Sequence, residues 1–320
     1  MSTSDSAIRW LLSSADPSVR YITLTEVCGV SERSAQAARL RAAIPSSRRV
    51  RALLRGQRGD GGFGGHPYKK WDGAHWRLVS LVELRIPKRH PLAVRALDQV
   101  LGWLHSDGHR RSIMRLNGRV RRCASQEGNA LRVASRLGLG GDERVRRLAH
   151  DLASWQWPDG GWNCDRRPGV DHSSFHESLI PLWALIEYRE ATTDRSVDEP
   201  IERAAEFFLH HRLFRSDHNG TIIHPSFLQL RYPPYWHYDV LTALRVMARI
   251  GKLGDRRAGE ALDVIKAKRG RTGLWGASGR WWRPRGRASG AIEVVNWGSR
   301  GPNEMITLHA LSVLRAAGRA

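Results

Sequence analysis

Apolar residues recur along most of this 320-residue chain at intervals of three and four, the spacing that places them on one face of an α-helix. Runs in which apolar and polar residues alternate, as in half-buried β-strands, are nearly absent. The pattern predicts an all-α protein, with two or three short helices in residues 5–45 and another at 46–55. Longer helices are expected at residues 71–84, 91–104, 123–137, 142–155, 173–188, 200–211, 238–250, 256–268 and 305–315.

A glycine-rich turn interrupts this helical pattern more than once. It occurs at residues 57–65 and 156–165, and in degraded form at 271–276. Asp and Pro favour tight turns, and paired glycines supply backbone angles that other residues adopt only at a cost. The repeating unit is helix, short loop, helix and turn, recurring about every fifty residues, which predicts a repeat architecture. Helix pairs of this kind form either an open solenoid or a closed ring, and periodicity alone does not separate the two.

The composition bears on whether the chain spans a membrane and on the compartment in which its cysteines reside. No run of eighteen apolar residues occurs, and the first seven residues lack the apolar segment of a signal peptide. The three cysteines, Cys28, Cys123 and Cys164, are an odd number and far apart, which favours a reducing, cytoplasmic environment and thiols that pack or bind metal.

Basic residues are in large excess, with 52 Lys and Arg against 31 Asp and Glu and a formal net charge of +21. Three interpretations stay open: a general compositional bias, attraction of a polyanionic small substrate such as a diphosphate, or contact with nucleic acid or an acidic membrane surface. The arginines are scattered and no nucleic-acid-binding motif is present, so we expect no nucleic-acid partner, whereas peripheral membrane contact stays open. The glycines at 61–65 lack both the Walker lysine and a preceding strand, so no nucleotide cofactor is expected.

Metal-ligand side chains gather after the second turn. Cys164, His172 and His176 are residue types that bind zinc, and the two histidines are four apart, on one face of a helix. The alternative is that the cysteines are small buried side chains and the histidines ordinary turn and helix-face residues.

The turns carry a family resemblance. A Gln followed by Gly-Gly and an aromatic residue, as at 57–63 and 156–162, resembles the repeat of protein prenyltransferase β subunits and of squalene and terpene cyclases. The resemblance implies an α/α toroid over residues 50–320, preceded by a helical segment at 1–49. It implies inner helices that begin at Trp71, Cys123, Ser173, Tyr238 and Met305, and outer helices that begin near Pro91, Asp142, Pro200 and Arg256.

The same resemblance extends to zinc. In prenyltransferases an Asp-x-Cys at the start of one inner helix and a His at the start of the next hold the metal, and Cys123 and His176 match these two positions. The family aspartate is replaced here by Arg121. We therefore predict a site of Cys123, Cys164, His172 and His176, with Asp171 as a substitute ligand or as an orienting group. Four ligands would make a structural zinc, and three would leave a position open for catalysis.

The resemblance supports three functional hypotheses. The first is a zinc-containing enzyme that acts on an isoprenoid or other apolar substrate, with Arg119, Arg121 and Arg122 neutralising a diphosphate. The second is a cyclase in which Asp239, paired with His237, or Glu304 is the acid, although the Asp-x-Asp-Asp pattern of cyclases is missing. The third is a non-catalytic, metal-stapled module that binds a lipid or a protein. Nothing indicates the α subunit of prenyltransferases.

Tryptophan is abundant, with 13 residues. Trp71, Trp76 and Trp236 are expected to line the substrate cavity, because aromatic faces stabilise carbocations and fit polyprenyl chains. Ordinary core packing accounts for these tryptophans equally well.

Overall fold

The computed structural model describes residues 3–279, 293–298 and 301–320 and confirms the all-α class. Each helix expected from the periodicity is present within a few residues of its predicted bounds. The α-helices are α1 (Thr3–Leu12), α2 (Pro17–Ile22), α3 (Ala35–Ala43), α4 (Arg48–Leu54), α5 (Ala74–Glu83), α6 (Pro91–Leu104), α7 (Asp107–Arg111), α8 (Ser125–Arg136), α9 (Glu143–Ser154), α10 (Phe175–Thr192), α11 (Asp198–His210), α12 (Val240–Arg249), α13 (Gly259–Ala267) and α14 (Glu304–Ala316).

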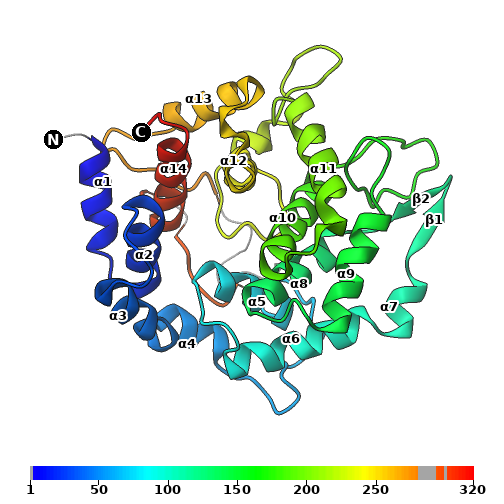
Figure 1. The fold of residues 1–320 in the computed structure, drawn as a ribbon, viewed down its shortest axis with the longest axis horizontal. Helices are drawn as coiled ribbons and strands as arrows, with labels where there is room; N and C mark the ends of the chain where they lie inside the picture. Colours follow the sequence, from blue (N-terminus) through cyan, green and yellow to red (C-terminus); the bar gives the residue numbers. More distant parts are fainter. Residues whose placement is uncertain (1–2, 280–292, 299–300) are drawn as a thin grey trace, which may run out of the picture.

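The longer helices form two layers (Figure 1). Helices α5, α8, α10, α12 and α14 are buried over most of their length, and each contacts the next in this order. Helices α6, α9, α11 and α13 pack on the outside of α5, α8, α10 and α12 with one apolar face and expose the other. The N-terminal helices α1 and α2 contact α14 and share its hydrophobic core, while α4 contacts α5. The predicted boundary near residue 49 stays a prediction.

The segment between the helices predicted at residues 91–104 and 123–137 contains structure that the periodicity does not reveal. Helix α7 is followed by a hairpin of β1 (Met114–Leu116) and β2 (Arg119–Arg121), which pair antiparallel. Strands of three residues are too short for an alternating pattern to stand out. No helix in the described residues combines the length and apolarity needed to span a bilayer.

Buried charges join the inner helices. Glu83 of α5 forms ion pairs with Arg132 of α8 and, at 2.9 Å, with Arg245 of α12, and His309 of α14 lies 3.5 Å from the same carboxylate. Arg132 is also 3.7 Å from Glu187 of α10. The cations hold the pKa of Glu83 well below its usual value despite complete burial, which by itself would raise it.

The first glycine-rich turn is fixed by its glutamine. Nε2 of Gln57 donates hydrogen bonds to the carbonyl oxygens of Gly61 at 2.9 Å and of Leu92 at 2.8 Å, so the turn is bonded to the start of α6. Gly61 has φ +83°, and a Cβ there would lie 2.2 Å from the carbonyl oxygen of Arg95. The close approach to α6 therefore requires glycine.

The second turn repeats these contacts. Nε2 of Gln156 donates to the carbonyl oxygens of Gly160 and Pro200, both at 2.8 Å, which joins the turn to α11. Gly160 has φ +96°, and a Cβ there would lie 2.4 Å from the carbonyl oxygen of Arg203. The shared geometry confirms that the two turns are equivalent parts of a repeat.

The degraded third turn keeps part of this geometry with a different side chain. Nε of Arg269 donates to the carbonyl oxygen of Gly273 at 3.1 Å, as the glutamines do to the glycine four residues later. The indole Nε1 atoms of Trp162 and Trp275 each donate to the carbonyl ten residues earlier, at 2.9 and 2.7 Å. An arginine thus replaces the glutamine of the repeat.

The fit of Gly160 against α11 predicts a large penalty for a side chain there. Gly160→Ala should lower the free energy of unfolding by about 2–4 kcal/mol, because the methyl group meets a backbone oxygen at an unfavourable φ. Gly102→Ala in α6 is the matched control: nothing lies within 4 Å of its new Cβ, and alanine should stabilise the helix by up to about 1 kcal/mol. Urea denaturation measures the free energy of unfolding of both variants. Equal changes in Gly160→Ala and Gly102→Ala would contradict the prediction.

Candidate metal centre

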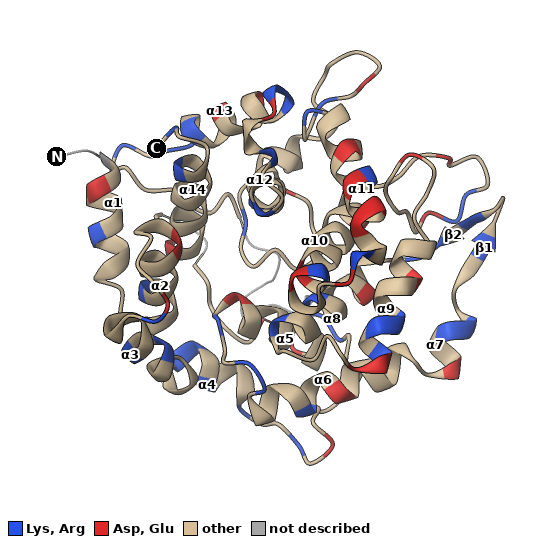
Figure 2. Cartoon of the chain, viewed as in Figure 1, with Lys and Arg blue, Asp and Glu red and all other residues tan. Residues whose placement is uncertain are grey.

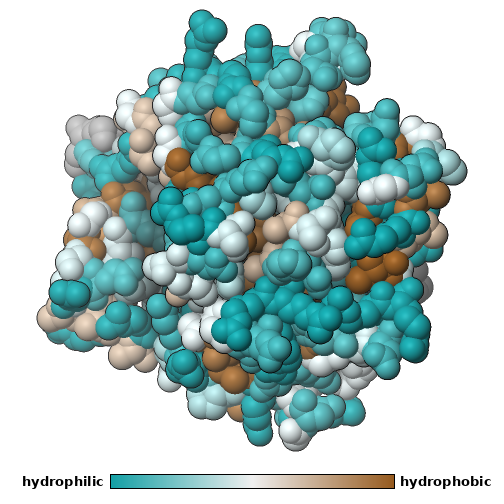
Figure 3. Space-filling view, turned by 45° about the vertical axis from the view of Figure 1, so that its right-hand side comes forward, coloured by the Kyte–Doolittle hydropathy of each residue, from teal (hydrophilic) through white to brown (hydrophobic). Residues whose placement is uncertain are grey.

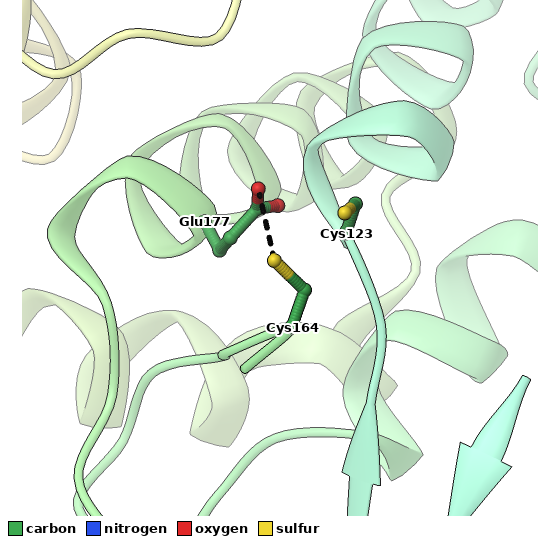
Figure 4. Close-up of side chains that lie close together, drawn as sticks. All are labelled: Cys123, Cys164 and Glu177. Carbon is green, nitrogen blue, oxygen red and sulfur yellow. Dashed lines mark hydrogen bonds between the residues drawn. The ribbon is translucent and has the colours of Figure 1, made fainter. Parts of the chain in front are cut away.

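Two cysteines and a glutamate meet at one end of the inner helices. One ligand atom from each of Cys123, Cys164 and Glu177 lies within 4.8 Å of the other two. Figure 4 shows the Cys164 thiol directed at the Glu177 carboxylate, with Cys123 beside them on the segment that leads into α8. The Cys164 Sγ donates a hydrogen bond of 3.8 Å to Oε1 of Glu177. Both cysteines are partly exposed, whereas Glu177 is buried.

The second glycine-rich turn places the two cysteines side by side. Arg121 at the end of β2 forms a parallel bridge with Asn163, and the Arg122 amide donates to the Asn163 carbonyl at 3.1 Å. Each cysteine follows this bridge within two residues along its own segment. Two positions distant in sequence therefore converge because a strand and a turn share a backbone hydrogen bond.

Glu177 comes from the first turn of α10, which the same glycine-rich turn holds. The Trp162 amide donates to Oγ of Ser178 at 2.9 Å. Oε2 of Glu177 accepts a hydrogen bond of 3.1 Å from the amide of Ser125, the first residue of α8. The carboxylate thus caps α8 with one oxygen and faces the thiols with the other.

The three groups shift one another's pKa values. Interaction with the neighbouring Cys164 thiol lowers the pKa of Cys123, and interaction with Cys123 raises the pKa of Cys164. Burial raises the pKa of Glu177, and the hydrogen bond from Ser125 offsets only part of this effect. A cation between the three groups would stabilise all of them in their anionic forms.

One donor separation can be compared with the geometry of a zinc site. Zn–S bonds of about 2.3 Å and Zn–O bonds of about 2.0 Å at the tetrahedral angle place sulfur and oxygen about 3.5 Å apart. The observed separation of Cys164 Sγ and Glu177 Oε1, 3.8 Å, is close to this value. Thiolates with a carboxylate are donors that zinc accepts in proteins.

The structure brings together the two predicted cysteines but not the predicted histidines. Neither His172 nor His176 joins the cluster in the described part of the chain. The side chains of Asp171 and His172 are 78% and 76% exposed and lie 3.5 Å from each other. His176 is half-buried, and its Nδ1 accepts a hydrogen bond of 2.8 Å from the amide of Tyr238. Burial lowers the pKa of His176 to about 4, so the ring is neutral at pH 7.

Glu177 is the member of the cluster that sequence reasoning missed. It directly follows His176, and adjacent residues of a helix point about 100° apart, so only one of the two faces the thiols. The sequence contains one indication of its position: Glu177 is a carboxylate at the start of a predicted inner helix, next to His176, which matches the zinc-ligand histidine of prenyltransferases.

Aromatic side chains and one lysine lie next to the cluster. Lys70 interacts electrostatically with Cys123 and Glu177, and its Nζ lies 5.3 Å from the ring centre of Trp71 and 4.8 Å from that of Trp236. Trp71 is buried and stacked on Tyr235 with ring centres 4.7 Å apart. Trp76 is also buried, in edge contact with Trp71, whereas Trp236 is half-buried.

The three arginines predicted to bind a diphosphate lie in different surroundings. Arg122 binds Glu127 at 2.9 Å and contacts His109, which bonds the same carboxylate. Arg121 is buried with its guanidinium 4.5 Å from the ring centre of Trp157. Arg119 lies over the same indole at 5.5 Å. Arg122 therefore belongs to a buried ionic group, and the other two flank a tryptophan.

The predicted acids have structural contacts. Asp239 caps α12, with its two oxygens bonded to the amide (2.9 Å) and hydroxyl (3.2 Å) of Thr242. Glu304 forms an ion pair of 2.8 Å with Arg49 and accepts a hydrogen bond from Ser14. It lies at a pocket of about 410 Å³ that is lined by residues 14–16, α4, residues 294–296 and the start of α14. His237 is half-buried and stacked on Trp236, and burial lowers its pKa to about 2.

The burial of Asp239 predicts a pH-dependent stability. Desolvation raises its pKa to about 6, above the value of about 3.9 for an unfolded chain. The folded state thus binds this proton more tightly, and the resulting stabilisation is present below about pH 4 and lost as the pH rises through 6. Asp239→Asn keeps the helix cap, so its stability relative to wild type should rise by about 2–3 kcal/mol from pH 4 to pH 7. Urea denaturation measures the free energy of unfolding of both proteins as a function of pH. The same pH dependence in wild type and Asp239→Asn would contradict the raised pKa of Asp239.

Comparison of the chain with models of protein families and with curated proteins gives no match. The resemblance to prenyltransferases and terpene cyclases therefore remains a prediction that depends on the repeated turns.

Proposed function

We propose that this protein is a zinc-containing enzyme of the prenyltransferase and terpene-cyclase type that acts on an apolar, isoprenoid-like substrate. The observation that carries the proposal is the Cys123, Cys164 and Glu177 cluster, which opens to solvent next to half-buried aromatic rings. A buried structural zinc would not need accessible thiols or neighbouring half-buried rings.

The proposal includes a closed α/α toroid. Its support is the order of contacts, because α5, α8, α10, α12 and α14 follow one another and α14 contacts α1 and α2. The N-terminal helices then fill the arc between the last inner helix and the first, since α4 contacts α5. In such a ring the first turns of the inner helices lie at one rim, where Glu177 is found.

Three ligands suit a catalytic rather than a structural zinc. A site with three protein ligands keeps a fourth position for water or substrate, whereas structural sites are filled by four. Two thiolates, one carboxylate and Zn²⁺ sum to one negative charge, and Lys70 supplies the compensating positive charge. His176 lies next to Glu177 on α10. Only its Nε2 atom is available to bind a metal ion, because Nδ1 accepts a hydrogen bond from the amide of Tyr238.

The chemistry divides between the metal and the chain. Zinc bound there would lower the pKa of an acceptor group in the open position and so make it a nucleophile at neutral pH. Trp236 and His237 present ring faces that would hold an apolar chain and shield a developing carbocation. Lys70, over Trp71 and Trp236, would attract the anionic leaving group.

The cyclase alternative depends on Asp239. Its raised pKa favours the protonated form, as an acid catalyst requires, but both oxygens are used in capping α12. The contacts therefore support a structural role for this residue, and we do not advance it as the acid.

The metal assignment predicts one tightly bound zinc per chain. Cys123→Ser and Cys164→Ser should each weaken zinc binding by about a hundredfold or more, and Glu177→Gln by less, because Gln can still accept from Ser125. Cys28→Ser is the matched control, since Cys28 is an exposed thiol outside the cluster. Elemental analysis and competition with a chromophoric chelator measure this. Equal zinc content in all four variants would overturn the site.

The substrate class predicts turnover of at least one prenyl diphosphate. Zinc-loaded wild type and Cys28→Ser should release pyrophosphate from geranyl, farnesyl or geranylgeranyl diphosphate in the presence of water and a small thiol, whereas Cys123→Ser should not. Product mass spectrometry identifies the acceptor. Complete inertness of the loaded protein toward all three would favour the non-catalytic module.

A further inference from the structure

A second pocket, separate from the cysteine cluster, lies between the β1–β2 hairpin and the second glycine-rich turn. It has a volume of about 540 Å³, within the usual range for small-molecule sites. Its lining residues are Arg115, Asn117, Gly118, Arg119, Val120, Ser154, Trp155, Gln156, Trp157, Pro158 and Arg203. Three of them are arginines, and no lining residue is acidic in the described chain. Figure 2 shows the basic residues on the two strands at this edge of the molecule.

None of Arg115, Arg119 and Arg203, the three arginines of the pocket, forms an ion pair with a described residue, whereas Arg110 and Arg144 do. Nε of Arg119 is buried and has no hydrogen-bond partner among the described residues. Arg119 and Arg203 are half-buried and Arg115 is exposed, so an anion bound among them would take the place of water as the partner of their guanidinium groups.

Two of the three guanidinium groups contact the turn. Nη2 of Arg203 donates to the carbonyl oxygens of Trp157 at 2.9 Å and Pro158 at 3.3 Å. Arg119 lies over the Trp157 indole, whose Nε1 donates to the Val120 carbonyl at 2.9 Å. The carboxyl end of α9 borders the pocket, but its dipole is equivalent to only about half a negative charge. Three cations therefore leave the pocket strongly positive.

From this convergence we propose that the pocket between the β1–β2 hairpin and α11 binds a phosphate-bearing small molecule with two or more negative charges. Guanidinium groups match phosphate oxygens with paired hydrogen bonds, and three of them suit a diphosphate better than a single carboxylate. The pocket adjoins the strand that carries Arg121 toward Cys123, yet it does not include the metal cluster. The face of the molecule in Figure 3 is largely hydrophilic, with hydrophobic residues in small separate groups.

Isothermal titration calorimetry with inorganic phosphate and pyrophosphate tests the proposal on the full chain. Pyrophosphate should bind saturably and more tightly than phosphate, and more weakly as salt is raised. Arg119→Gln should weaken binding by about tenfold or more, and Arg115→Gln, at an exposed strand position, by about fivefold. Arg147→Gln, an exposed arginine of α9 outside the pocket, removes the same charge and should change affinity less than twofold.

The outcomes separate a built site from general attraction to a basic protein. Equal losses in Arg147→Gln and the pocket variants, or no saturable binding of pyrophosphate, would overturn the proposal. Cys123→Ser, titrated in parallel, should retain the component of pyrophosphate binding that Arg119→Gln removes, because no pocket residue belongs to the cysteine cluster. Loss of that component in Cys123→Ser, together with its retention in Arg119→Gln, would place the anion at the cysteine cluster instead and would also overturn the proposal.

Discussion

The fold and the candidate site depend on how the second glycine-rich turn is held. Gln156 ties it to α11, Trp157 ties it to β2, and Trp162 ties it to α10. A Cβ at Gly161 would lie 2.4 Å from Oγ of Ser178, so the turn reaches α10 only because that position has no side chain. The same few residues thus bring the side chains of Cys123, Cys164 and Glu177 close together.

The inner helices are tied at their other end by charge. Glu83 is the last residue of α5, and Glu187 is ten residues beyond Glu177 on α10, a distance of about 15 Å along a helix. Arg132 and Arg245 both lie against the Trp183 ring, at 3.6 and 4.7 Å. A buried ionic group fixes which helices can be neighbours, because exchanging one would leave charges without partners. The opposite end is free to carry partly exposed, reactive groups.

The sequence predicts the helices well because long amphipathic and buried segments have a strong period, and paired glycines mark the turns. It predicts Cys123 and Cys164 as neighbours only through the family resemblance, because no local pattern links two loops 41 positions apart. It does not predict the β1–β2 hairpin, whose strands are three residues long, although this hairpin aligns Cys123. His172 is exposed rather than turned toward the thiols, since side-chain direction at the irregular start of α10 cannot be derived from helical spacing.

The central claim is that Cys123, Cys164 and Glu177 share one metal ion, and X-ray absorption at the zinc edge of the loaded protein tests it most directly. The account predicts two sulfur neighbours at about 2.3 Å with oxygen or nitrogen at about 2.0 Å. A shell of oxygen and nitrogen alone would show that the metal binds elsewhere and would contradict the account.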